Sequence, residues 1–292
     1  MLTELATEVA PVSQRRVAPD VQARMSYVHP GATMPISYAY EPPPGVPWES
    51  SEFVNPVTLI SDARAHSNEH RLHVNGFELV DAPTAVRDFY DRAEVEAVYY
   101  DELLELALQV TGGAYGFVFD HLVRKRDLAQ KTLSFGRKVK GQPPSANGRI
   151  HNDYTESSGR KRLRLVLGDG ETVESVRRYC IVNVWRSIAH PVLDAPLALC
   201  DSRTVSVMDA VVSEVRYPQR SGEIYLFKQS ELHRWYYYPE MNKHEAVVFK
   251  QYDSQLSGVS RFTPHAAFEL PNVPAGIPPR ESIEARVLVV FE

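Results

Sequence analysis

Cysteine is scarce in this 292-residue chain, which contains only Cys180 and Cys200. Two thiols cannot build a four-sulfur metal site and are too few for a disulfide-stapled scaffold, so we expect both to be small buried residues. No run reaches the ~18 uninterrupted apolar residues that a membrane helix needs. The amino terminus carries Glu4 and Glu8 and lacks the basic-then-apolar order of a signal peptide. The sequence therefore predicts a cytoplasmic protein without a membrane partner.

An excess of positive charge is also missing, because 32 basic side chains stand against 37 acidic ones, for a net charge of −5. A nucleic-acid partner would require a basic surface, so none is expected. The one basic run, residues 160–164, has no interleaved aromatic residues. It is either a solvated face or, near the mouth of an active site, a place where Arg164 receives an anionic substrate. Histidine is abundant by contrast, with ten residues, which directs attention to nitrogen and oxygen ligands.

The chain divides by composition at about residue 50. Prolines recur through residues 1–50, where each fixes φ and removes a backbone donor, so we predict an extended arm there. Arms of this kind often cross to a neighbouring subunit, which favours a homodimer. The remainder, residues 51–292, is predicted to be a single domain with a helical layer at about 83–112. Thr84 would cap the first of two helices, which break near Asp91 and end at Gly112.

Most of the remaining segments have the composition of short strands separated by turns. Asn75-Gly76 is a typical hairpin turn between two of them. Many short strands after a helical section predict a β-sandwich or jelly roll with helices packed outside. The expected strands are Val57–Ile60, Leu72–Val74, Phe77–Val80, Tyr115–Leu122, Arg162–Leu167, Tyr179–Trp185, Thr204–Val207, Glu223–Phe227, Ala246–Tyr252 and Ala285–Phe291.

The pattern His151-Asn152-Asp153 is the strongest local signal for chemistry. At a strand end the side chains of His151 and Asp153 point to the same face, because successive strand residues alternate between faces. About 80 residues later His233 follows another predicted strand. Two imidazoles and one carboxylate form the facial triad of non-heme Fe(II) oxygenases, which leaves positions open for a 2-oxo acid and O₂. A zinc hydrolase can use the same ligands, and a His-x-Asp tripeptide also occurs by chance, so both alternatives stay open.

A series of short patches along the chain together form a specific pattern. They are, in order, Asp62-Ala63-Arg64, 75–79, Asp88-Phe89, Tyr99-Tyr100, Thr111-Gly112, Phe119-Asp120-His121, Arg124, 151–154, 183–186, 196–198, Cys200-Asp201, 233–237 and 249–254. With these patches the sequence resembles the hydroxylase/desaturase family, which includes fungal gibberellin-desaturase-like enzymes and the cephalosporin 7-alpha-methoxylation protein. The resemblance covers about residues 55–292. One departure is Ser187, where the family pattern has proline after Trp-Arg.

The resemblance implies a double-stranded β-helix (cupin-like jelly roll) and an Fe(II)- and 2-oxoglutarate-dependent dioxygenase. Such an enzyme uses O₂ and hydroxylates, desaturates or cyclises a small specialised metabolite by C–H abstraction. Carried over residue by residue, the metal ligands are His151, Asp153 and His233. Two alternatives remain: a metal-dependent hydrolase on the same barrel, and a non-catalytic partner of a biosynthetic enzyme.

A basic residue should bind the distal carboxylate of 2-oxoglutarate. Lys250 lies in an apolar predicted strand, and a buried lysine is costly unless it meets an anion. Its ammonium could instead reach solvent past the strand end. Arg186, close to Asn183, and Arg286, in the last apolar strand, are alternatives, because arginine is the better bidentate clamp.

Several further side chains have weaker assignments. Tyr154 either hydrogen-bonds the co-substrate or packs. Trp235 and Tyr236 are candidates for the substrate pocket, although aromatic runs more often pack in cores. Five other histidines have weaker assignments: His73 and His121 are expected to be structural or exposed, and His190, His244 and His265 are expected to lie in loops.

Overall fold

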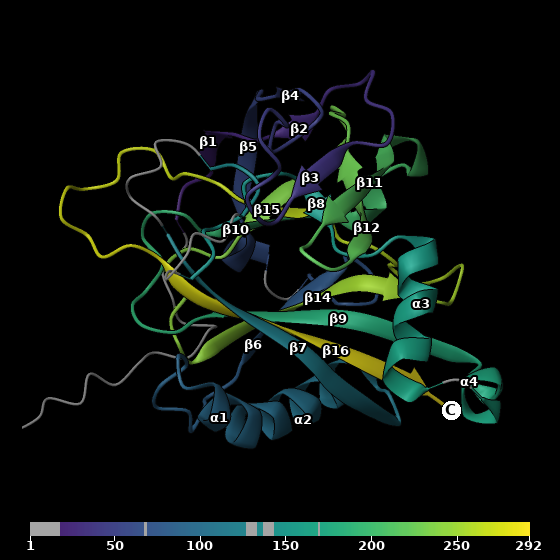
Figure 1. The fold of residues 1–292 in the computed structure, drawn as a ribbon. Coiled ribbons are helices and arrows are strands. Elements are labelled where there is room, and N and C mark those ends of the chain that lie inside the picture. Colours follow the sequence, from purple (N-terminus) through teal and green to yellow (C-terminus); the bar gives the residue numbers. More distant parts are fainter. Residues whose placement is uncertain (1–17, 67–68, 127–132, 137–142, 169) are drawn as a thin grey trace, which may run out of the picture.

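The computed structural model describes residues 18–66, 69–126, 133–136, 143–168 and 170–292. Two β-sheets face one another, and the helical segment of residues 92–111 lies outside the smaller sheet (Figure 1). This confirms the predicted jelly roll. No helix in the described ranges is long and apolar enough to cross a membrane.

The larger sheet has nine strands and the smaller sheet has five. In spatial order the larger contains β1 (Val21–Arg24), β5 (Val57–Asp62), β13 (Trp235–Tyr237), β10 (Leu197–Cys200), β15 (His265–Ala267), β8 (His151–Asn152), β12 (Ser221–Phe227), β11 (Ala210–Arg216) and β3 (Ile36–Tyr38). The smaller contains β6 (Phe77–Asp81), β14 (Glu245–Asp253), β9 (Arg178–Ser187), β16 (Glu281–Phe291) and β7 (Tyr115–Lys125). A separate ribbon pairs β2 (Tyr27–Val28) with β4 (Phe53–Val54).

One continuous helix forms the outer layer, through α1 (Arg92–Glu94), a π-helical stretch η3 (Val95–Tyr99) and α2 (Tyr100–Thr111). The Asp91 side chain caps its start, and Gly112 ends it in the left-handed conformation. The predicted first helix from Thr84 does not form. Side chains bind the backbone of this segment instead. Thr84 Oγ1 accepts from the Val86 N–H, and the Glu94 carboxylate accepts from the N–H groups of Arg87 and Asp88.

The two faces of the smaller sheet have different neighbours, and strand β14 shows this directly. Ala246 and Val248 belong to the apolar cluster beneath α2, whereas Val247 and Phe249 belong to the cluster between the sheets. The alternation follows from strand geometry, in which successive side chains point to opposite faces. We call the first face the helix side and the second the inner side.

The predicted strand Arg162–Leu167 is wrong, because this segment lies in helix α3 (Glu156–Leu167). Thr155 and Ser158 form a capping box at its start. Leu163, with Val166 and Leu167, packs on the inner side of the smaller sheet. These apolar positions at three- and four-residue spacing were a helical signal that the short strand pattern obscured.

Two more predicted strands are absent. Leu72–Val74 forms a turn, so Asn75-Gly76 closes no hairpin. Thr204–Val207 spans two 3₁₀ turns, η4 (Ser202–Thr204) and η5 (Val207–Asp209), capped by Asp201 and Ser206. Short polar side chains that bond nearby amides here outcompete the sheet ladder. The remaining short elements are η2 (Ala63–His66) and α4 (Glu171–Ser175).

Part of the proline-rich segment joins the body of the protein. Strand β1 pairs with β5, and β3 pairs in parallel with β11. Residues 1–17 lie outside the described ranges. The division of the chain at residue 50 stays a prediction.

Candidate metal centre and its cavity

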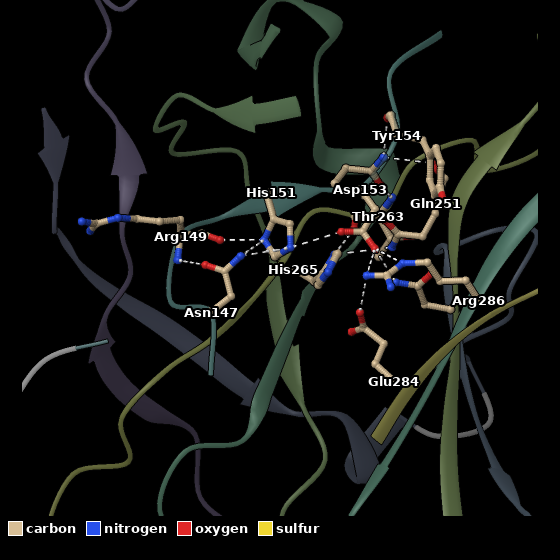
Figure 2. A network of polar contacts seen from close by, with 12 residues as sticks. Asn147, Arg149, His151, Asp153, Tyr154, Gln251, Thr263, His265, Glu284 and Arg286 are labelled. Atoms are coloured by element: carbon tan, nitrogen blue, oxygen red, sulfur yellow. Dashed lines mark hydrogen bonds and ion pairs between the residues drawn. The ribbon is translucent and has the colours of Figure 1, made fainter. Parts of the chain in front are cut away.

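Three potential ligands meet where β8 and β15 pair in the larger sheet. His151 and His265 are register partners of these antiparallel strands, and Asp153 follows β8. One ligand atom from each residue lies within 4.8 Å of the others. The ring centroids are 4.3 Å apart, and His151 Nε2 lies 3.4 Å from Asp153 Oδ1 (Figure 2).

Both imidazoles are oriented by backbone carbonyls. His151 Nδ1 donates to the Arg149 carbonyl at 2.7 Å, and His265 Nδ1 donates to the Thr263 carbonyl at 3.0 Å. A proton on Nδ1 leaves the lone pair on Nε2, as in histidines that bind metals. His265 Nε2 is buried and has no hydrogen-bond partner among the described residues. Burial, followed by the nearby His151, lowers the pKa of His265 to about 3, which keeps this ring neutral.

The third member, Asp153, is held as a carboxylate. Its Oδ2 accepts from Asn183 Nδ2 and from Arg286 Nε, each at 2.9 Å. Its backbone N–H donates to Gln251 Oε1 at 2.7 Å. Burial opposes ionisation, but Arg286 and then His151 outweigh it and hold the pKa of Asp153 well below its usual range.

This donor set fits a divalent transition metal. Two neutral imidazole nitrogens and one carboxylate are the ligands of the 2-His-1-carboxylate centre that binds Fe(II). The buried, unpartnered lone pair of His265 is the strongest sign, because a buried polar atom without a partner costs free energy unless a ligand meets it.

His233 does not join this cluster, which corrects the prediction from sequence. Its Nε2 lies 3.1 Å from Asp209 Oδ2 and its Nδ1 lies 3.1 Å from the Tyr27 hydroxyl. Trp235 Nε1 donates to the same hydroxyl at 2.8 Å. Both ring nitrogens of His233 therefore have protein partners. The second histidine of the cluster is His265, not His233.

The two basic residues preferred as co-substrate anchors lie on the helix side of the smaller sheet. Lys250 follows Ala246 and Val248 in the alternation and forms a buried ion pair with Asp253. Arg186 Nη1 donates to the carbonyls of Ala82 and Lys243, at 2.8 and 3.1 Å. Phe249 shows where the centre lies, because this inner-side ring is 4.8 Å from the His265 ring. Lys250 and Arg186 thus face away from the three ligands.

The remaining predicted residues divide between the centre and the core. Arg286 and Asn183 contact Asp153, as described above, and Tyr154 lies beside it in a cavity. Trp235 packs against Tyr27 at a centroid distance of 6.3 Å, and Tyr236 packs against Phe77 at 6.1 Å. Arg164 is exposed on α3 and does not line the cavity.

A cavity of about 1310 Å³ opens onto His151 and Asp153. Its walls come from β7, α3, β11, β12 and Arg286 in the middle of β16, together with part of the proline-rich segment. Its charged groups include Arg124, Arg162 and Arg286. This volume exceeds the ~300–1,000 Å³ of typical small-molecule sites, so there is room for two ligands at once.

Sequence reasoning missed His265, Thr263 and Gln251. Pro264 precedes His265 directly, which made the segment resemble a loop, whereas it forms a three-residue strand. The short apolar run Ala266-Ala267-Phe268 after His265 was the available signal. Gln251 lies next to a register shift in β14, which no sequence pattern announces.

The chain is similar to proteins of known class over nearly its whole length. The matching family model, described as an oxidoreductase/YMDC permease-like domain, covers residues 25–290. Hydroxylase/desaturase efuI of Hormonema carpetanum is 31% identical over 252 residues, which cover 80% of this chain and 83% of that protein. The Fe(II)/2-oxoglutarate-dependent dioxygenase nvfI of Aspergillus novofumigatus is 29% identical over 277 residues, covering 92% and 96%.

The fold agrees with these similarities. A solved structure of the iron and alpha-ketoglutarate-dependent endoperoxidase NvfI superposes with a TM-score of 0.80 at 26% identity, covering 94% of this chain and 98% of that one. The fold, the cluster of two histidines with an aspartate and the extent of the matches agree. The chain belongs to the hydroxylase/desaturase family of Fe(II)- and 2-oxoglutarate-dependent oxygenases.

Proposed function

We propose that His151, Asp153 and His265 hold the Fe(II) of this oxygenase, and that the chain oxidises a small specialised metabolite in the adjoining cavity. The observation that carries the proposal is the pair of carbonyl-bonded Nδ1 atoms, which leaves the lone pair of each ring on Nε2 in a cluster whose ligand atoms lie within 4.8 Å of one another. Bound iron would bring O₂ and 2-oxoglutarate together and supply the oxidising power that removes hydrogen from a substrate C–H bond.

The chain's own residues fix the geometry of the ligands. Arg149 and Thr263 set the tautomers through their carbonyls, as shown above. Asn183 and Arg286 fix the orientation of the Asp153 carboxylate, while Gln251 holds its backbone. Such outer partners typically change metal affinity or activity by about 10–100-fold when they are removed.

Arg286 is the proposed anchor for the distal carboxylate of 2-oxoglutarate. Besides Asp153, its guanidinium contacts Glu284 and Asp120, each at 3.1 Å. Asp120 is half exposed, with 54% of its side chain accessible, so this ion pair is weak and can be exchanged for a ligand carboxylate. Tyr154, whose side chain also lines the cavity, is the proposed second polar contact.

The test is the visible absorption band that Fe(II) and 2-oxoglutarate give together under anaerobic conditions. We expect the band in the unchanged protein and its loss in His151→Ala, Asp153→Ala and His265→Ala. Arg286→Met should require far more 2-oxoglutarate, whereas Asp120→Asn should not. A band that persists in His265→Ala with unchanged intensity would overturn the ligand assignment.

The reaction outcome and the assembly are further proposals. The relatives are named as hydroxylases, desaturases and an endoperoxidase, so we propose hydroxylation, desaturation or cyclisation here. Product analysis by mass spectrometry with ¹⁸O₂ separates oxygen insertion from desaturation. We also propose that the enzyme works in the cytoplasm without a nucleic-acid partner and forms a homodimer, which light scattering after size exclusion tests.

A further inference from the structure

Arg162 is a partly buried cation of the cavity with neither a carboxylate partner nor a hydrogen bond to its guanidinium in the described structure, whereas Lys161 and Arg220 of the same wall are exposed to solvent. Arg124 donates to the Ser145 carbonyl at 2.9 Å, and Arg286 bonds three carboxylates. Arg162, from α3, is half-buried, and its Nε is buried without a hydrogen-bond partner. Among the described residues no carboxylate lies within ion-pair distance of it, and its guanidinium carbon lies 4.7 Å from the Phe119 ring centroid.

The carboxylates of the cavity wall are already engaged or exposed. Glu214 pairs with Arg216 at 3.1 Å, and Glu223 accepts from Thr155 Oγ1 at 3.3 Å. Asp120 and Asp153 pair with Arg286. Glu41 is exposed to solvent. None of these acids neutralises Arg162 in the described structure.

The side chains around Arg162 indicate what kind of molecule could fill the cavity. The cavity wall is rich in apolar side chains, including Leu122, Phe135, Leu165, Val215 and Ile224. Arg162 lines the same cavity as Tyr154, which follows Asp153 directly in the chain. A charged donor left unpaired on burial costs free energy. A ligand that supplies the acceptor would recover this free energy.

We propose that Arg162 binds an anionic group of the substrate, and that the substrate is a large, mainly apolar molecule carrying one carboxylate. The proposal rests on the proposed function for the identity of the cavity as the reaction site. Guanidinium and carboxylate form two parallel hydrogen bonds, so this contact would fix both the position and the orientation of the substrate. Arg162 is then a specificity-determining residue, and it lies in the basic run of α3 that the sequence marked for an anionic substrate.

A matched pair of fluorescent probes tests the charge requirement. 1-Pyrenebutyric acid and 1-pyrenebutanol share one apolar body and differ in the carboxylate. We expect the acid to bind the full chain about tenfold more tightly than the alcohol, because only the acid gains a charge-assisted hydrogen bond with Arg162. Arg162→Gln should remove this difference by weakening the acid alone, and Arg162→Lys should restore part of it.

Arg164→Gln is the control, because Arg164 lies on the same helix but is exposed and outside the cavity. It should leave both affinities unchanged. Equal binding of acid and alcohol to the unchanged protein, or equal losses in the Arg162 and Arg164 variants, would overturn the proposal. Displacement of the acid by saturating 2-oxoglutarate with Mn(II) would also overturn it, by assigning Arg162 to the co-substrate.

The two proposals fail separately in this design. Probe binding needs neither iron nor turnover, so a lost carboxylate preference with an intact anaerobic iron band refutes only the role of Arg162. A retained preference without any iron band refutes only the metal centre.

Discussion

His151 and His265 face each other across two neighbouring antiparallel strands, with ring centroids 4.3 Å apart. Their positions therefore depend on a sheet ladder rather than on mobile loops. The carbonyls that orient their Nδ1 atoms belong to Arg149 and Thr263, each two residues earlier in the chain. On both strands, the histidine is therefore oriented by the carbonyl of the residue two positions before it.

The choice between His265 and His233 can be decided by metal content. His265→Ala should lose stoichiometric Fe(II) after anaerobic loading and desalting, because one of three ligands is gone. His233→Ala should retain one iron per chain. It should unfold more easily, by about 1–3 kcal/mol, because Asp209 and Tyr27 lose a buried partner. Iron loss in His233→Ala with iron retained in His265→Ala would reverse the assignment.

Gly76 should affect iron affinity from a distance. Its φ is +98°, and an added Cβ would lie 2.3 Å from Thr263 Oγ1, next to the carbonyl that orients His265. Strain and overpacking predict a loss of about 2–4 kcal/mol for Gly76→Ala. Iron affinity should fall about 10–100-fold, which is the range for outer partners. Urea unfolding and competitive iron titration measure the two effects.

The control for this prediction is Gly45→Ala. Gly45 also has a positive φ, +82°, but an added Cβ would have no neighbour within 4 Å. Gly45→Ala should lower the free energy of unfolding by about 1–2 kcal/mol, the cost of a left-handed backbone for a residue with a Cβ. Its iron affinity should be unchanged. Equal iron affinities in the two variants would remove Gly76 from the support of the centre.

Lys250 should contribute to stability and not to co-substrate binding. Lys250→Met leaves the buried Asp253 with Arg178, at 3.0 Å, as its ion-pair partner in the described structure. Removing one partner of a buried ion pair costs about 3–5 kcal/mol, so urea unfolding should show a large loss. The affinity of the Mn(II)-loaded protein for 2-oxoglutarate should remain unchanged. A tenfold loss of that affinity would mean that Lys250 reaches the inner side after all.

The same ion pair predicts acid sensitivity. Burial opposes ionisation of Asp253, but Arg178 and Lys250 outweigh it and lower the pKa of its carboxyl. A lowered folded-state pKa gives stability that is present above the unfolded value of about 3.9 and is lost as pH falls through the folded value. Asp253→Asn should therefore be less stable than the unchanged protein at pH 7, with the gap narrowing below about pH 4. A pH-independent gap in urea unfolding would contradict this.

Both cysteines should be unreactive in the folded protein. Burial raises the pKa of the Cys180 thiol to about 11 and that of Cys200 to about 12, and thiolate is the reactive form. Ellman's reagent at pH 8 should find no fast-reacting thiol before denaturation and two afterwards. A fast-reacting thiol in the native protein would show that one of these sites opens.

The sequence predicted the features that rest on strong local patterns. His151 and Asp153 follow from strand alternation, and Arg286 was named because a charge in an apolar strand needs a partner. The jelly roll followed from the number of short strands and turns. These features depend on neighbours within a few residues, which sequence patterns report well.

The errors at His265 and Lys250 arose because the pairing of strands distant in sequence decides which side chains meet, whereas the wrongly predicted strands arose from competing local signals. His265 lies beside His151 only because β15 pairs with β8 across the larger sheet. Lys250 and Arg286 both lie in apolar strands, and only the sheet order shows that they face opposite sides. Helix α3 was mistaken for a strand because basic residues separate its apolar positions, whereas its capping box at Thr155 decides its start.

The register shift after Lys250 gives strand β14 a break in its alternation. Gln251 bonds Asp153, and the next residue, Tyr252, packs with Tyr154 and Leu163. The consecutive side chains of Gln251 and Tyr252 therefore both lie on the inner side of the smaller sheet, where the first contacts Asp153 and the second packs against α3. Deleting one residue at this shift would restore a regular strand. The contact with Asp153 and the packing against α3 would then have to come from opposite faces of the sheet. The extra residue thus mechanically joins the metal centre to the helix that carries Arg162.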